Sequence, residues 1–116
     1  MEGNGSLLCV GLDPDPERIP ASVGVVPFLR EIIAATADLV CCFKPNAAFF
    51  EQQGAAGWEQ LAAVISSVPA EIPVLLDAKR GDVPNTAAAY ARAVFETLGA
   101  DAVTANPYLG GDGLEP

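Results

Sequence analysis

Four short apolar runs alternate with helix-like segments, and this alternation restricts the possible folds more than any other feature. The runs cover residues 7–12, 39–43, 74–76 and 101–106. Short apolar runs separated by helical segments are typical of βαβ units, whose parallel strands are joined by right-handed crossovers. The order therefore predicts an α/β fold, either an open doubly wound sheet or a (β/α)8 barrel. A complete barrel needs about 250 residues and eight strands, so the 116 residues here would make a half-barrel.

The first two intervening segments have the periodicity of amphipathic helices. One covers residues 27–39, and the other begins at about Trp58. Their apolar stripes are Leu29, Ile32, Ile33 and Thr36 in the first, and Trp58, Leu61, Ile65 and Val68 in the second. We expect these stripes to face the core rather than a cofactor.

A third helix is predicted after the run at 74–76. Pro84 suits a first helical turn, and Asn85 is a possible cap. An apolar stripe follows at Tyr90, Val94 and Leu98. Gly99 then predicts the end of the helix, because glycine accepts the left-handed backbone that often terminates helices.

Composition and charge exclude several classes of function. A chain that is 51% hydrophobic is neither disordered nor a coiled coil, and its length suits one domain. The net charge of −9 argues against nonspecific nucleic-acid binding, although a few focused basic groups can still bind a small anion. No apolar run reaches the roughly 18 residues that a membrane span needs. The N-terminus lacks the basic patch of a signal peptide, so we expect a cytoplasmic protein.

The cysteines and the lack of histidine restrict the chemistry further. Cys9, Cys41 and Cys42 lie inside apolar runs, without CxxC spacing, and the chain has no histidine. A zinc site or a structural disulfide is therefore not expected. We expect buried free thiols in a reducing cytoplasm instead. Ser-His-Asp and Cys-His catalysis are excluded.

Strand parity gathers polar side chains at one edge of the predicted sheet. Side chains alternate between the faces of a strand, and each run has one uniformly apolar face. The other face becomes polar only at its C-terminal end, which is where parallel α/β folds place their active sites. The residues expected to converge there are Asp13, Lys44, Asp77, Lys79 and Asn106. Alternating charge would keep both lysines protonated and the carboxylates ionised.

Two charged residues beside this cluster fall outside the pattern. Asp82 follows a glycine, five residues after Asp77, so it cannot share the strand face. We expect Asp82 to point to the far side of the loop or into a neighbouring subunit. Alternatively, Asp82 is simply a solvated acid near a helix N-terminus. Arg80 has no role that the pattern assigns, and we expect it in solvent.

The segment DAKRGDVPNT resembles the D-x-K-x-x-D-[IV]-x-x-T signature of orotidine 5′-phosphate decarboxylase. The segments CVGLDPD, FKPNAAFFE and TANPYLGGDGLEP are similar to the longer-chain bacterial type 2 of that family, and the resemblance runs over residues 8–116. It implies a homodimeric (β/α)8 TIM barrel that converts orotidine 5′-phosphate to UMP and CO₂ in pyrimidine biosynthesis, without a cofactor or metal. Residues 1–116 would be its N-terminal half, truncated after strand four, and inactive or weak alone.

The resemblance also implies roles for individual residues. Lys79 would be the proton donor to C6, and Asp77 would lie beside the leaving carboxylate. Lys44 would touch the ribose and order the neighbouring aspartate, while Asp13 would hold the ribose hydroxyls. Asp82, with Thr86, would reach the site and the ribose of the partner subunit.

Two other functions remain open. A metal-dependent sugar-phosphate lyase of the same superfamily, such as a 3-keto-gulonate-6-phosphate decarboxylase or a hexulose-phosphate synthase, shares D-x-K-x-x-D but needs acidic Mg²⁺ ligands on the early strands. Lys44 stands where such a site would want a carboxylate. The other alternative is a non-catalytic, truncated half-barrel that folds only by association, which the stop inside GGDGLEP favours.

Overall fold

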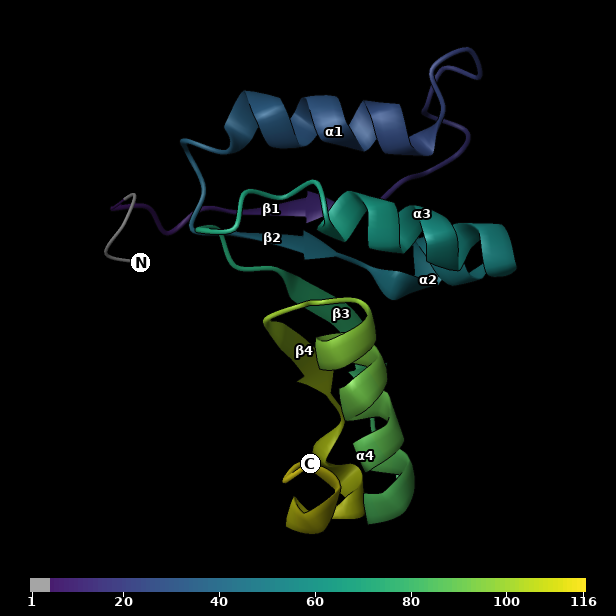
Figure 1. The fold of residues 1–116 in the computed structure, drawn as a ribbon, viewed down its shortest axis with the longest axis vertical. Helices are drawn as coiled ribbons and strands as arrows, with labels where there is room; N and C mark the ends of the chain where they lie inside the picture. The colour runs from purple at the N-terminus through teal and green to yellow at the C-terminus, as the bar shows by residue number, and fades with distance from the viewer. Residues whose placement is uncertain (1–4) are drawn as a thin grey trace.

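Four parallel strands form the frame of the fold in the computed structural model, which describes residues 5–116 (Figure 1). They are β1 (Cys9–Leu12), β2 (Cys42–Pro45), β3 (Leu75–Arg80) and β4 (Ala102–Ala105). β1 pairs with β2 and β3 pairs with β4, while bridges from Phe43 to Val74 and from Asn46 to Asp77 connect β2 to β3. The spatial order is therefore the chain order, as in a barrel wall, whereas a doubly wound sheet reverses its order at a switch point.

Helices follow each of the first three strands. They are α1 (Val25–Thr36), α2 (Ala47–Glu51), α3 (Ala55–Ile65) and α4 (Pro84–Ala91), which continues as a π-helical segment (Arg92–Thr97). Figure 1 shows α1 and α3 beside β1 and β2, and α4 along β3 and β4, which are turned steeply relative to the first pair. No helix within residues 5–116 has the length and apolar character to cross a membrane.

The short helix α2 was not predicted from the sequence. Its five residues span little more than one turn, too few to display a helical period. It forms because the Asn46 side chain caps it by accepting a hydrogen bond from the Ala48 amide. The chain then returns as α3, and Gly57 lets the two helices touch: a Cβ there would lie 1.8 Å from the carbonyl oxygen of Phe50.

The core lies between the strands and the helices of this outer layer. Its largest fully buried side chains include Phe43, Phe50, Leu12, Leu61 and Leu76. The predicted stripe of α1 is confirmed at Leu29 and Ile33, which are buried. The predicted stripe of the second helix is only partly right: Leu61 and Ile65 are buried and Val68 is partly buried against the core, but Trp58 is 38% exposed.

The third predicted helix is confirmed in position but not in its cap. Pro84 is its first residue, as expected, and Gly99 follows it with a φ of 74°. The N-cap is Val83 rather than Asn85, which lies inside the first turn, so that prediction was wrong. Of the predicted stripe, Val94 is buried, whereas Tyr90 is 37% exposed.

Candidate active site

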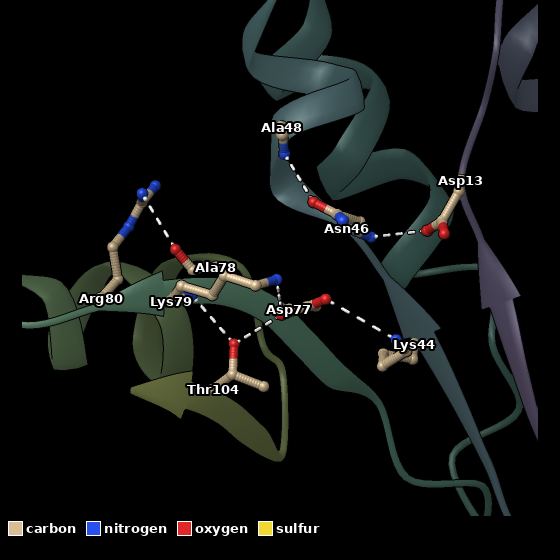
Figure 2. A network of polar contacts seen from close by, with 9 residues as sticks. All are labelled: Asp13, Lys44, Asn46, Ala48, Asp77, Ala78, Lys79, Arg80 and Thr104. Atoms are coloured by element: carbon tan, nitrogen blue, oxygen red, sulfur yellow. Dashed lines mark hydrogen bonds and ion pairs between the residues drawn. The ribbon is translucent and has the colours of Figure 1, made fainter. Parts of the chain in front are cut away.

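Asp77, on β3, is the centre of a polar cluster at the C-terminal ends of the strands (Figure 2). It is only 8% exposed, the one charged residue among the buried side chains described. The Lys79 Nζ lies 2.6 Å from Asp77 Oδ1, and the Lys44 Nζ lies 3.7 Å from Oδ2. Thr104, on β4, donates its hydroxyl to Asp77 Oδ1 at 2.8 Å. Three strands thus contribute to one carboxylate.

The partners of Asp77 determine its charge. The hydrogen bond from Lys79 and then that from Thr104 lower the pKa of Asp77 below its ordinary value, and they outweigh burial, which acts in the opposite direction. Asp77 is therefore ionised at neutral pH. One carboxylate between two ammonium groups leaves a local charge of about +1 in a strongly acidic chain, which suits an anionic ligand. The side chain of Lys79 is 69% exposed, so its ammonium can also meet such a ligand.

A bulge in β3 aims Lys79 at Asp77. Leu76 pairs with Val103 and Arg80 with Ala105, so β3 takes four steps where β4 takes two. Lys79 has a φ of 50°, the only positive φ of a non-glycine residue among those described, and its amide donates to Thr104 Oγ1 at 3.0 Å. This left-handed backbone costs about 1–2 kcal/mol. Strain of this kind persists only where neighbouring groups hold it, and it often marks functional sites.

Asp13 ties the end of β1 to the end of β2. Its Oδ1 accepts a hydrogen bond from the amide of Asn46 at 3.1 Å, directly after the strand that carries Lys44 (Figure 2). Asp13 thus lies at the predicted edge, although no hydrogen bond or ion pair within residues 5–116 joins it to Asp77. Asn106, also expected in the cluster, instead caps the turn that follows β4: its Oδ1 accepts from the Tyr108 amide.

Arg80 is not a solvent-exposed side chain, which corrects the expectation from the sequence. Its guanidinium forms an ion pair with Glu51 of α2 and lies 5.2 Å from the ring centroid of Tyr90 on α4. The side chain is 26% exposed. The sequence pattern could not show this, because both partners are far from Arg80 in sequence and are brought to it by the packing of the helices.

Asp82 and Thr86 stand apart from the cluster, as parity predicted for Asp82. Asp82 accepts a hydrogen bond from the amide of Val83, and the Thr86 hydroxyl lies 3.5 Å from Asn85 Oδ1. Neither is joined to Asp77 or Lys79 by a hydrogen bond or ion pair in the described part of the chain. Their expected contact with a partner subunit stays a prediction.

The three cysteines are free thiols, but they are not buried as expected: Cys9 is exposed, and Cys41 and Cys42 are only partly buried. Cys9 and Cys42 are paired in register across β1 and β2. Burial, helped by the hydrogen bond with Cys9, raises the pKa of the Cys42 thiol to about 12, so it stays protonated and unreactive at neutral pH. No group of three or more histidine, cysteine, aspartate or glutamate side chains that could hold a metal ion occurs among residues 5–116.

Thr104 is the site residue that sequence reasoning missed. Parity put it on the polar face of the fourth run, but nothing in the sequence fixes which residues of β3 and β4 lie opposite each other. The bulge in β3 sets this register. Its irregular residue is Lys79 rather than a glycine, so the sequence does not indicate the bulge. The available signal was a hydroxyl on the strand adjacent to Asp77.

Comparison with known proteins finds one matching family and several similar chains. Residues 6–116 match the model of the orotidine 5′-phosphate decarboxylase / HUMPS family. The chain is 60% identical to the orotidine 5′-phosphate decarboxylase of Thermomicrobium roseum and 56% identical to that of Herpetosiphon aurantiacus, with 97% of this chain and 42% and 44% of the relatives covered. It superposes on the Leishmania donovani OMP decarboxylase structure with a TM-score of 0.88 at 52% identity, covering 96% of this chain and 43% of that one.

These matches confirm the fold prediction. The chain spans about two-fifths of the length of the relatives it matches, and it corresponds to part of the N-terminal half of their (β/α)8 barrel. The consecutive order of β1 to β4 agrees with that architecture and excludes the doubly wound alternative.

Proposed function

Because the chain belongs to the orotidine 5′-phosphate decarboxylase / HUMPS family, we propose that it supplies one half of the active site of an orotidine 5′-phosphate decarboxylase. The observation that carries this proposal is the ammonium of Lys79 held 2.6 Å from the buried carboxylate of Asp77, with Lys44 on the other side. The relatives with 53% identity or more that carry this decarboxylase name support the choice of reaction.

Lys79 is the catalytic group in this proposal. When the bond between C6 of the pyrimidine and its carboxylate breaks, CO₂ leaves and the electron pair stays on C6. A fixed ammonium stabilises this developing charge and then transfers a proton from Nζ to C6, which gives UMP and a neutral lysine that regains its proton from solvent. Lysine suits both tasks, because it provides the charge and the proton from one atom.

Asp77 holds Lys79 for this step and lies beside the leaving carboxylate. Since its pKa is below the ordinary value, Asp77 remains a carboxylate throughout the neutral range and keeps the ammonium oriented. Lys44 approaches the same carboxylate from β2 and is proposed to touch the ribose. Asp13, exposed at the end of β1, is proposed to accept hydrogen bonds from the ribose hydroxyls.

Asp82 and Thr86 are proposed to act across a homodimer interface. Both lie at the entry to α4, and their only hydrogen-bond partners among the described residues lie in that same short segment. A partner subunit's ribose is the contact that the family resemblance assigns to them.

The alternative of a metal-dependent sugar-phosphate lyase of the same superfamily fits this site less well. A divalent cation at the end of β2 would meet the ammonium of Lys44 rather than a carboxylate. A decarboxylase that works as proposed keeps its activity in EDTA, whereas the metal-dependent enzyme loses it.

Residues 1–116 are proposed to form a partial barrel that is a weak catalyst alone. In the described structure β1 pairs only with β2 and β4 only with β3, so each leaves one strand edge open. Remote binding groups beyond these four strands would be absent, and binding energy from such groups helps to drive catalysis.

The test uses a complete barrel, meaning this chain in its full natural length or residues 6–116 joined to the remainder of the Thermomicrobium roseum relative. We expect it to form UMP and CO₂ from orotidine 5′-phosphate equally well with and without EDTA, and residues 1–116 alone to be much slower. A complete barrel that folds but leaves orotidine 5′-phosphate unchanged would refute the proposed function, and activity lost in EDTA would point to the metal-dependent alternative.

A further inference from the structure

We propose that Arg80 is a positioning residue that holds the bulge of β3, and with it the direction of the Lys79 side chain toward Asp77. The inference rests on the proposed function, since its effect on turnover is measured with orotidine 5′-phosphate. Arg80 itself touches neither Asp77 nor Lys44: in Figure 2 its side chain extends away from both. Its effect on the site must therefore pass through the backbone of β3.

The guanidinium of Arg80 connects β3 to two helices. One terminal nitrogen, Nη2, forms the ion pair with Glu51 of α2, and the other, Nη1, donates to the carbonyl oxygen of Ala78 at 3.4 Å. The Tyr90 ring of α4 lies under the guanidinium carbon, 5.2 Å from its centroid, within the range of a cation–π contact. Glu51 and Tyr90 are 29 and 10 residues away from Arg80 in sequence, so the side chain anchors the strand end to the outer helical layer.

Hydrogen bonds on both sides of residue 79 restrain its backbone. The bond from Arg80 Nη1 to the Ala78 carbonyl spans the residue between them, and the carbonyl of Arg80 accepts from the Asn106 amide at 2.6 Å. The Lys79 amide itself donates to Thr104 Oγ1 on β4. Residue 79 is thus restrained on both flanks while its backbone is in the left-handed region, with a φ of 50°.

The restraint matters because an unrestrained lysine prefers a negative φ. If the anchor is removed, residue 79 can relax toward extended backbone, and the Nζ leaves its position 2.6 Å from Asp77 Oδ1. A shift of this kind of about 1 Å can cost on the order of 100-fold in rate, even when the altered residue is remote from the reaction.

An arginine is better suited to this task than a lysine. The planar guanidinium can face the Tyr90 ring while its two terminal nitrogens reach two different acceptors, and a lysine ammonium can do only part of this. A lysine at position 80 is therefore expected to keep the attraction to Glu51 but to lose the fixed geometry.

The experiment compares Arg80→Gln, Arg80→Lys and Glu51→Gln in the complete barrel with Arg92→Gln. Arg92 is an exposed arginine without an ion pair in the described structure, so Arg92→Gln makes the same chemical change away from the anchor. We expect Arg80→Gln to lower kcat by about 10- to 100-fold while KM changes by less than about threefold, because Arg80 does not touch substrate. Arg80→Lys and Glu51→Gln should show smaller losses, and Arg92→Gln none.

The pH profile separates positioning from a loss of folded protein. When Lys79 moves away, the pKa of Asp77 rises toward its ordinary value, so the acidic limb of the kcat profile should move to higher pH in Arg80→Gln. A merely structural role would reduce the folded fraction and leave this limb in place.

The outcomes distinguish this inference from the proposed function. If the unmodified complete barrel does not decarboxylate orotidine 5′-phosphate, the proposed function fails. If it does, and Lys79→Ala abolishes turnover while Arg80→Gln matches Arg92→Gln in kcat and pH profile, the positioning role of Arg80 is overturned alone. If Arg80→Gln does not fold, the positioning role is tested with Arg80→Lys and Glu51→Gln instead. The role is overturned if both of these variants have the same kcat and the same pH profile as Arg92→Gln.

Discussion

Replacing Thr104 by valine tests how the cluster around Asp77 is held together. Valine has nearly the same shape as threonine but lacks the hydroxyl, which donates to Asp77 Oδ1 at 2.8 Å and accepts from the Lys79 amide at 3.0 Å. A hydrogen bond to a charged group contributes about 1.5–3 kcal/mol, and one between neutral groups about 0.5–1.5 kcal/mol. Water can replace Thr104 at the Lys79 amide, which lies in an exposed region, so that bond adds little. We therefore expect Thr104→Val to lower the free energy of unfolding at pH 7 by about 1.5–3 kcal/mol.

The pH dependence of this loss gives the sharper test. The pKa of Asp77 is lowered in the folded protein, so the stability that its ionisation contributes is present above the unfolded value of about 3.9 and is lost as the pH falls through the folded value. Thr104 is the second-largest cause of the lowering, after Lys79. Without the hydroxyl the folded pKa rises, so less stability remains to be lost in acid.

The assay is urea unfolding of the complete barrel at pH 7 and at a series of lower pH values, down to the lowest at which the unmodified protein still folds. Thr104→Ser is the matched control that keeps the hydroxyl. The difference between Thr104→Val and the unmodified protein should be larger at pH 7 than at the acid end of this series. A difference equal at both ends of the series, or a valine variant as stable as the serine variant at pH 7, would refute this account of the cluster.

Two further predictions concern the fold. Gly57→Ala should lower the free energy of unfolding by about 3 kcal/mol or more, because its Cβ would lie 1.8 Å from the Phe50 carbonyl oxygen. Gly111→Ala is the control, because a Cβ at Gly111 would meet open space. It should change the free energy of unfolding by less than about 1 kcal/mol in the same assay. Equal effects would contradict the close contact of α2 and α3. Cys42, whose pKa is raised to about 12, should react much more slowly with a thiol reagent at pH 8 in the folded protein than after unfolding in urea. Labelling of Cys42 in the folded protein at the rate of a free thiol would show that its pKa is not raised.

The fold could be predicted from the sequence because its signals are local. Each apolar run is short, ends in polar residues and is followed by a helical period, so the alternation of strands and helices follows from patterns within a few residues. Parity also grouped Lys44 and Asp77 correctly, since a strand fixes which side chains share a face, whereas Lys79 reaches Asp77 through a bulge that parity does not describe. The strand order, which decides between a barrel and a doubly wound sheet, depends on pairing between distant segments and needed the structure.

What the sequence could not predict depends on packing at long range or on very short elements. Helix α2 spans five residues and is set by one capping contact. The roles of Arg80 and Thr104 arise from partners on other elements, and the bulge at Lys79 carries no glycine that would reveal it. Trp58 was wrongly assigned to the core because a helical stripe does not show where the covered face ends.

The role of Lys79 is tested most directly by the rate of UMP formation from orotidine 5′-phosphate in the complete barrel with Lys79→Ala. We expect the unmodified protein to turn over its substrate and kcat to fall by at least about 100-fold in the variant, while the folding of the variant, followed by circular dichroism, is unchanged. A folded Lys79→Ala protein with a kcat equal to that of the unmodified protein would contradict the assignment of Lys79 as the proton donor.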